Sequence, residues 1–336
     1  MKFILKISGF VFAMCIFVIS CNENRTKTDV SNIDLKLKLY RFEKELFGLN
    51  LDSIEYCIPD LEKKHGEFFD LFNQKIINIG GTNVKDYPIY LNRFLTDFLI
   101  IEIHEKTENH FADFNPIEED LTQAFKYYKY YFPKNEIPTI YTYISGFNQS
   151  VVVADGIIGI GLDKYLGADC DYYQKMTIPS FSRYKMKKEK IVPDVITALA
   201  IAEFPYNDSL DNVLNRMIYN GKIMYFLDQI LPETHDSVKI SYTPTQLEWC
   251  TQSESEMWTF LVENKILFKS DYMEIKRYFD DGPFTASFPR QSPARTGIWL
   301  GWQIVRSYMK NNTVSLNELM LDKDYQKILN LSKYRP

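Results

Sequence analysis

One stretch near the middle of the chain decides its fold. Residues 192–232 read VPDVITALAIAEFPYNDSLDNVLNRMIYNGKIMYFLDQILP. From Val195 to Phe204 nearly every residue is apolar, which is typical of a helix buried on all sides. Pro205 predicts the end of this helix, because proline disfavours helical geometry in the residue before it. Apolar residues and one glycine then recur at spacings of three and four, which predicts one face of a second helix: Leu210, Leu214, Met217, Ile218, Gly221, Met224 and Tyr225.

The second predicted helix carries two local signals. Asn207 and Asp208 are residue types that cap helices by accepting backbone N–H groups, so we expect the helix to begin just after them. Gly221 lies inside the helix, where glycine is less favourable than alanine by about 1 kcal/mol. A glycine at this position predicts that another backbone approaches the helix closely.

A buried helix followed by a second helix is also how zincin peptidases hold their metal. Those enzymes need His-Glu-x-x-His on the first helix, which places two imidazoles one turn apart beside a carboxylate. Here the first helix has no histidine, and the place for a Glu-Gly pair reads Asn220-Gly221. The simplest interpretation is a pair of core helices. The alternative hypothesis is a degenerate zincin-like core whose ligands have been replaced.

The beginning of the chain resembles a bacterial lipoprotein signal peptide. Lys2 and Lys6 precede an apolar run over 7–19, which is too short to span a bilayer comfortably. Residues 18–21 read VISC and fit a lipobox. The resemblance implies cleavage before Cys21 and lipid, including palmitate, on its thiol and amine. The alternatives are an ordinary signal peptide and a signal anchor.

These signals divide the chain into three parts. We expect a signal peptide over 1–20, which is excluded from the fold, a lipidated tether over 21–34, and a single globular α-rich domain over 35–336. Of the 336 residues, 46% are hydrophobic and 25% charged, which is ordinary for a globular protein. The formal net charge of −5 argues against nucleic acid as a partner, because phosphate binding needs a basic surface.

Strands are predicted in only two places. The alternation LKLKL at 35–39 is typical of a half-buried strand, and its lysines suit the edge of a sheet. Residues 137–162 read as further strands, with a hairpin at Asp155-Gly156, a strong turn signal. Residues 42–132 are mostly helical in pattern. We therefore expect a mainly α (α+β) fold, a helical domain with a small antiparallel sheet.

The C-terminal part is predicted to be helical as well. Thr243-Pro244 supplies a cap and a first turn for a helix that we expect to continue through Leu261. Gly297 and Gly301 open another helix, and their spacing of four lets a neighbouring helix come close. The basic residues over 185–190 are interpreted as a solvated loop.

No arrangement in the sequence predicts a reaction. No nucleophile–base pair is recognisable. The four histidines lack the spacing of a zinc site: His65, His104, His110 and His235. Outside the leader and the lipobox the cysteines show no C-x-x-C pattern, so we interpret them as buried thiols: Cys57, Cys170 and Cys250. We expect no catalytic residue, no metal and no cofactor.

Several segments, taken in order, point to one family. The longer ones are YYKYYFP at 127–133, GLDKYLG at 161–167, IVPD at 191–194, MIYNGK at 217–222 and PARTGIWLGWQIVRSYM at 293–309. The shorter ones are Leu231-Pro232, Tyr242-Thr243, Trp249 and Ser332-Lys333-Tyr334. By these segments and the lipobox Cys21, the chain resembles the gliding motility lipoprotein GldB family of Bacteroidota over essentially its whole length.

The resemblance implies a lipoprotein of the cell envelope that is required for surface gliding and works with machinery tied to type IX secretion. It implies attachment to a membrane through lipid on Cys21, a domain that faces the periplasm, and other gliding-machinery proteins as partners. The family carries no established catalytic residue, so only Cys21 is carried over as a functional position. Most family members have an acid where this chain has Asn220, which removes a third ligand from any metal-based alternative.

Three functions follow from the sequence. The preferred one is a non-catalytic accessory lipoprotein of the gliding apparatus. The second is a divergent zincin-like metallopeptidase with non-standard ligands, suggested by the buried helix pair that follows a hairpin. The third is a lipoprotein that binds envelope glycan or peptide, suggested by an aromatic content of 15%.

Overall fold

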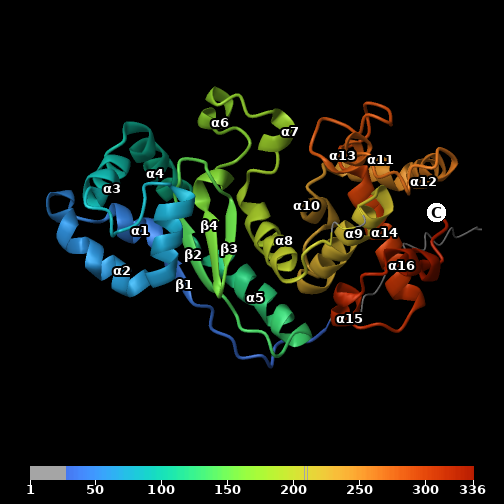
Figure 1. The fold of residues 1–336 in the computed structure, drawn as a ribbon, viewed down its shortest axis with the longest axis horizontal. Helices are drawn as coiled ribbons and strands as arrows, with labels where there is room; N and C mark the ends of the chain where they lie inside the picture. Colours follow the sequence, from blue (N-terminus) through green and yellow to red (C-terminus); the bar gives the residue numbers. More distant parts are fainter. Residues whose placement is uncertain (1–27, 208, 210) are drawn as a thin grey trace, which may run out of the picture.

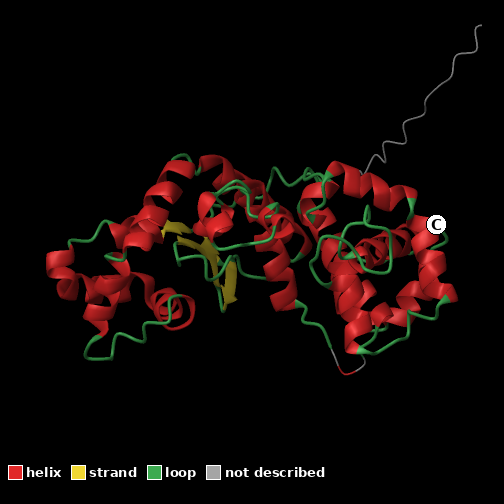
Figure 2. Cartoon of the chain, turned by 90° about the horizontal axis from the view of Figure 1, so that it is seen from above, coloured by secondary structure: helices red, strands yellow, loops and turns green. Residues whose placement is uncertain are grey.

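Helices make up most of this computed structural model, which describes residues 28–207, 209 and 211–336 (Figures 1 and 2). The expected mainly α (α+β) class is confirmed. The N-terminal half contains β1 (Leu39–Arg41), α1 (Phe42–Phe47), α2 (Ile54–Leu71) with a following π-helical turn (Phe72–Ile76), α3 (Tyr87–Leu95), α4 (Phe98–His110), α5 (Asn115–Tyr131), β2 (Thr139–Tyr143), β3 (Val151–Ala154) and β4 (Ile157–Gly161).

Among its described residues, the C-terminal half consists of helices joined by loops. It contains α6 (Asp171–Lys175), α7 (Ser180–Arg183), α8 (Ile191–Glu203), α9 (Val213–Ile230), α10 (Asp236–Ile240), α11 (Pro244–Gln252), α12 (Glu254–Glu263), α13 (Tyr272–Phe279), α14 (Thr296–Asn311), α15 (Leu316–Leu321) and α16 (Tyr325–Ser332). The expectation of one domain over 35–336 stays a prediction.

The sheet is mixed, which corrects the expected antiparallel one. Its strand order is β1-β2-β4-β3, and only β3 and β4 run antiparallel. A two-residue turn joins β3 to β4, with Gly156 at φ 65°, so these strands form the predicted hairpin. The chain between β1 and β2 instead passes through α1–α5, and a long crossover of this kind allows parallel pairing. Accordingly, β1 pairs in parallel with β2, and β2 with β4.

The predicted strand at 35–39 begins only at its last residue. Leu37 is buried and Lys36 and Lys38 are exposed, so the alternation of exposure is as expected. The carbonyl of Lys38 accepts the first ladder hydrogen bond, from Ile140 N at 2.8 Å. The segment before it has no strand beside it, because β2 begins at Thr139. The strand does lie at the edge of the sheet, as predicted.

The sheet separates two hydrophobic cores. Tyr141 and Tyr143 face a smaller core built from α1, α2 and α3, whereas Ile140, Ile158 and Ile160 face a larger core shared with α5, α8 and α9. In Figure 1 the first helices stand on one side of the strands, and α5 and α8 on the other. Successive side chains of a strand point to opposite faces, so one short strand contributes to both cores.

The predicted helix pair forms, but its second helix begins late. α8 ends at Glu203, just before Pro205, as expected. α9 begins at Val213, and its N-cap is Asn212, whose side chain accepts a hydrogen bond from Asn215 N at 2.8 Å. Asn207 caps only a local turn through Ser209 N, and Asp208 lies outside the described residues. The apolar spacing marks the face of α9 and does not mark where the helix starts.

The expected close approach at Gly221 is made by α14. A Cβ on Gly221 would lie 2.2 Å from the carbonyl oxygen of Gly301, and a Cβ on Gly301 would lie 1.8 Å from that of Met217. Both separations are far below van der Waals contact, so only glycine fits at either position. A Cβ on Gly297 would meet the ring of Phe279 in α13 at 2.8 Å. Both glycines of α14 thus sit against neighbouring helices.

The helix expected from Thr243 to Leu261 is two helices. Thr243 and Gln246 form a capping box at the start of α11, which confirms the predicted cap. α11 ends at Gln252 and α12 begins at Glu254, with Ser253 between them. Glu254 and Glu256 lie in the first turn of α12, where negative charge favours the start of a new helix.

We predict that Gly301→Ala destabilises the fold. Overpacking against a backbone carbonyl costs about 3 kcal/mol, which exceeds the intrinsic gain of about 1 kcal/mol for alanine in a helix. The free energy of unfolding should therefore fall by about 2 kcal/mol, measured as a lower denaturant midpoint. Gly282→Ala is the matched control, since the nearest atom to its added Cβ is 3.6 Å away. An equal effect of both substitutions would contradict the crossing geometry.

Candidate functional site

The four histidines lie apart and serve local roles. His65 is buried with Nε2 3.1 Å from a carboxylate oxygen of Glu45, and the ring of His104 stacks on Phe47 with centroids 4.2 Å apart. His235 caps α10 by accepting a hydrogen bond from Ser237 N. Burial lowers the pKa of His65, His104 and His110, although neighbouring carboxylates oppose this. Within 28–207, 209 and 211–336, no three His, Cys, Asp or Glu side chains lie close enough to hold a metal.

The helix pair uses its polar side chains for packing. Glu203 at the end of α8 accepts hydrogen bonds from the hydroxyl of Tyr128 and, at 3.4 Å, from Asn135 Nδ2. Asn220, at the position of the missing acid, donates to the carbonyl of Arg216 one turn earlier at 2.8 Å. The degenerate zincin-like core therefore has no ligand set among the described residues.

Asp163, in the segment GLDKYLG, is a buried carboxylate that holds a loop. Its Oδ2 accepts the backbone N–H groups of Ser145 at 3.0 Å and of Phe147 at 2.7 Å. Phe147 has φ 69°, an uncommon conformation for a residue with a side chain, so these bonds help to hold a strained turn. Burial raises the pKa of Asp163 to about 6, although the two N–H groups and Lys164 oppose this.

A second buried carboxylate, Asp228 of α9, joins three helices. Its oxygens accept Lys239 Nζ at 2.8 Å, Trp302 Nε1 at 2.9 Å, and Arg306 Nε at 2.8 Å and Nη2 at 2.9 Å. Arg306 also lies 3.8 Å from the centroid of the Trp302 ring. Two of these residues come from the segment 293–309, and Trp302 is fully buried. Asp228, Lys239 and Trp302 are shielded from solvent and Arg306 is partly exposed, so the cluster is a structural part of the core.

The segments that carried the resemblance contact one another. Tyr165 donates to Asp194 at 3.0 Å, which links 161–167 to 191–194. Gly221 and Gly301 link 217–222 to 293–309. These contacts lie inside the molecule and explain the order and spacing of the segments by packing. One exception opens onto a cavity, where Tyr242-Thr243 meets the start of 293–309.

The basic segment 185–190 is not simply solvated, which corrects its interpretation as an exposed loop. Lys190 is only 4% exposed. Its Nζ donates to the carbonyls of Val238 at 3.0 Å and Lys239 at 3.2 Å, and lies 3.2 Å from Asp194. Lys185 is paired with Asp281, nearly a hundred positions later. The sequence pattern gave no sign of these partners, because all but Asp194 are distant in the chain.

A cavity of about 320 Å³ lies between α7, the turn from α10 to α11, and the loop before α14. Lys185, Asp281 and Arg295 bring charge to its wall, and Tyr184 and Tyr242 bring rings. Arg295 Nε is 3.0 Å from Asp281 Oδ1, and Arg295 Nη2 donates to the carbonyl of Ile240 at 2.6 Å. This cavity is the candidate functional site, because three separate segments of the chain line it and two of them place charged groups in its wall.

The electrostatics of the cavity are unbalanced toward positive charge. Burial, followed by the nearby Arg295, lowers the pKa of Lys185, although Asp281 opposes this. Burial of the Asp281 carboxyl opposes its ionisation, but Arg295 and Lys185 outweigh this and hold its pKa below the usual range. The Asp281 carboxylate is thus paired with two cations, Lys185 and Arg295.

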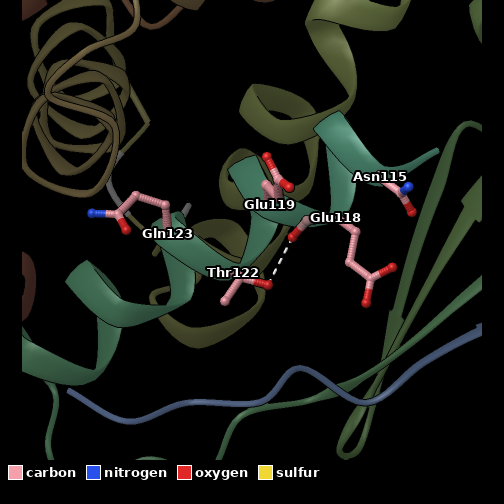
Figure 3. A pocket seen from close by; sticks show the side chains of 5 residues that line it. All are labelled: Asn115, Glu118, Glu119, Thr122 and Gln123. Atoms are coloured by element: carbon pink, nitrogen blue, oxygen red, sulfur yellow. Dashed lines mark hydrogen bonds between the residues drawn. The ribbon is translucent and has the colours of Figure 1, made fainter. Parts of the chain in front are cut away.

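A second hollow, on the exposed face of α5, is a weaker candidate (Figure 3). Its lining comes from α5 alone, and Thr122 bonds back to the carbonyl of Glu118 at 2.7 Å. Figure 3 shows Glu118 and Glu119 pointing in different directions. Two acids on the solvent side of one helix do not converge on a ligand.

The predicted lipidation site, Cys21, lies outside the described residues, as does the signal peptide over 1–20. Of the predicted tether, residues 28–34 are described. Cys57, Cys170 and Cys250 are free thiols. The last two are buried as expected, whereas Cys57 is only partly buried, which corrects its interpretation as a buried thiol. No helix in the part of the chain that the structure describes is both long and apolar enough to cross a membrane.

We predict that Asp163→Asn changes the pH dependence of stability. The folded state raises this pKa from 3.8 to about 6, so the wild-type chain loses stability as pH rises through this window. The asparagine variant cannot ionise. Its free energy of unfolding should therefore rise relative to wild type between about pH 4 and 6, by an amount on the order of 3 kcal/mol. Denaturation at each pH measures this, with Asp155→Asn at the exposed hairpin turn as control. Parallel profiles for the wild type and Asp163→Asn would contradict the prediction.

Comparison with known proteins gives one match. No curated protein and no solved structure matches the chain. The family model described as "Gliding motility protein GldB" matches residues 23–336, which includes every segment that carried the resemblance except the lipobox. The chain therefore belongs to the GldB family of gliding motility lipoproteins.

Proposed function

We propose that this chain is a non-catalytic, lipid-anchored protein of the cell envelope that is required for gliding motility and is accessory to the gliding and type IX secretion machinery. The observation that carries the proposal is the family match over residues 23–336. Its partners are proposed to be the membrane, through lipid on Cys21, and other proteins of that machinery.

The described tether suggests which end of the molecule lies near the membrane. Thr28 Oγ1 is 3.4 Å from the hydroxyl of Tyr131 at the end of α5, and that hydroxyl donates to Gln229 of α9 at 2.9 Å. Thr28 is seven positions after Cys21, a distance along the chain that reaches at most about 25 Å when extended. A lipid on Cys21 would therefore hold the end of α5 close to the bilayer, with the remaining domain in the periplasm.

The contacts of two helix carboxylates, the partly buried Glu203 and the buried Asp228, support a non-catalytic role. Glu203 and Asp228 accept hydrogen bonds from side chains that pack around them, and neither is paired with a histidine. A zincin-like peptidase would need a carboxylate base beside its metal ligands. The alternative of an envelope glycan- or peptide-binding lipoprotein is favoured by one observation, the charged cavity beside Arg295.

We predict that Cys21→Ala releases the protein from the membrane. Without the thiol no lipid can be attached, and the acyl chains supply about 0.8 kcal/mol per buried methylene. Fractionation of the envelope should show the variant outside the membrane fraction, and colonies should lose spreading. Cys57→Ala is the control, since it removes a free thiol of the folded domain. A Cys21→Ala protein that stays in the membrane would rule out lipid anchoring.

We predict that Glu203→Gln leaves spreading unchanged. Glutamine keeps an oxygen that accepts hydrogen bonds from Tyr128 and Asn135, so the packing role survives. A general base would lose about a hundredfold or more of its rate. Colony spreading and the amount of protein in the membrane should both match wild type. Lost spreading with normal protein levels would favour the peptidase.

A further inference from the structure

We propose that the cavity between α7, the α10–α11 turn and the 281–295 loop binds the carboxyl-terminal end of a peptide. In this arrangement the carboxylate lies between Lys185 Nζ and the guanidinium of Arg295, and it competes with Asp281 for these donors. The inference rests on the peptide-binding alternative given above and names its ligand group; it does not depend on lipid anchoring.

The first argument is the excess of positive charge. Two cations, Lys185 and Arg295, and one carboxylate, Asp281, line the cavity, and the buried Lys190 lies near both cations. Their carboxylate partners are Asp281, which pairs with Lys185 and Arg295, and Asp194, which pairs with Lys190. The whole chain has a formal charge of −5, so this local surplus runs against its overall balance. An entering carboxylate would reduce the surplus.

The second argument is the geometry of Arg295. Its backbone has φ 62°, a conformation that glycine adopts freely and that strains other residues by about 1–3 kcal/mol. The guanidinium is held from two sides, by Asp281 and by the carbonyl of Ile240. These contacts use Nε and one N–H of Nη2, and three of the five guanidinium N–H groups remain for a ligand. Guanidinium groups of this kind match the two oxygens of a carboxylate.

The third argument concerns the rest of the cavity wall. Phe181, Pro283 and Ala294 give it an apolar side, and Thr243 and Gln246 add polar groups. The volume of about 320 Å³ is at the lower end of ligand pockets, which range over about 300–1,000 Å³. A ligand that carries an anion, a small apolar side chain and an amide group would match the charged, apolar and polar parts of this lining. The last residues of a peptide provide all three, whereas inorganic phosphate provides only the anion.

Asp281 is the group that the ligand displaces. Its side chain is 49% exposed, compared with 23% for Lys185 and 17% for Arg295. It can therefore turn toward water while the cations stay in the wall. This competition predicts opposite effects of removing the cation and removing the anion.

The experiment is calorimetric titration of the full-length protein, purified in detergent, with three probes. They are N-acetyl-dialanine, its carboxyl-terminal amide, and inorganic phosphate. We expect the free acid to bind at least about tenfold more tightly than the amide, and more tightly than phosphate. Affinity should fall with added salt, because the site attracts its ligand by charge.

Three variants sharpen the test. Lys185→Gln should weaken binding of the free acid by about tenfold, a typical loss for one charged hydrogen bond. Asp281→Asn should strengthen it, because the competitor is gone. Lys188→Gln removes the same charge from an exposed neighbouring position and should leave affinity within about twofold. Arg295 is not substituted first. Its own backbone adopts the left-handed conformation just before α14, so a substitution there would change the turn as well as the charge.

Each outcome decides the proposal. Tighter binding to Asp281→Asn together with weaker binding to Lys185→Gln supports it. Equal binding of acid and amide, preference for phosphate, or no binding to the folded protein overturns it. An equal loss in Lys185→Gln and Lys188→Gln also overturns it, since general charge would then explain the effect. Melting curves of every variant show that the protein compared is folded.

Discussion

The contact between the backbones of α9 and α14 is the constraint on which most of the larger core depends. Gly221 and Gly301 remove the side chains that would keep the two helices apart, and a Cβ at either glycine would enter a backbone carbonyl of the other helix. Side chains can change rotamer to relieve a clash, whereas backbone carbonyls in helices cannot. The two helices therefore have one distance and one register. At Gly297, α13 also packs closely on α14, but there an added Cβ would first meet the side-chain ring of Phe279, at 2.8 Å.

The register set by this contact satisfies a buried charge. Asp228 lies about two turns beyond Gly221, and Trp302 and Arg306 follow Gly301 on the facing helix. At any other register the Asp228 carboxylate would lose these donors, and an unpaired buried charge costs several kcal/mol. The position of the cavity wall also depends on the contact between α9 and α14, because the wall is attached to the start of α14. Tyr242 donates to the carbonyl of Ala294 at 2.7 Å, so the cavity wall is built on the end of the helix that α9 holds in place.

Local patterns in the sequence predicted the elements and not their partners. The buried helix ending before Pro205, the hairpin at Gly156 and the close approach at Gly221 each depend on residues near them in the chain. The direction of the sheet strands depends on how far the chain travels through α1–α5 between β1 and β2, which periodicity does not encode. The site was missed for the same reason: Lys185, Asp281 and Arg295 meet across separate loops. A signal was present only for the separate Asp228 cluster, because Asp228 is the single charged residue in the apolar run at 223–231.

The two kinds of charged cluster in this protein call for different explanations. Around Asp163 and Asp228 the carboxylate is buried and receives several donors, so each cluster fixes a loop or a helix contact that would otherwise be open to rearrangement. At the cavity the carboxylate is the more exposed partner: the side chain of Asp281 is 49% exposed, whereas the two cations that pair with it, Lys185 and Arg295, are mostly shielded from water, with side chains 23% and 17% exposed. An ion pair with one half-exposed partner adds about 0–1 kcal/mol, which does not by itself offset the backbone strain of about 1–3 kcal/mol at Arg295; the hydrogen bond from Arg295 Nη2 to the carbonyl of Ile240 adds to it. The proposed peptide carboxylate would use the feature that the ion pair leaves over, namely two shielded cations that face one carboxylate able to turn toward water.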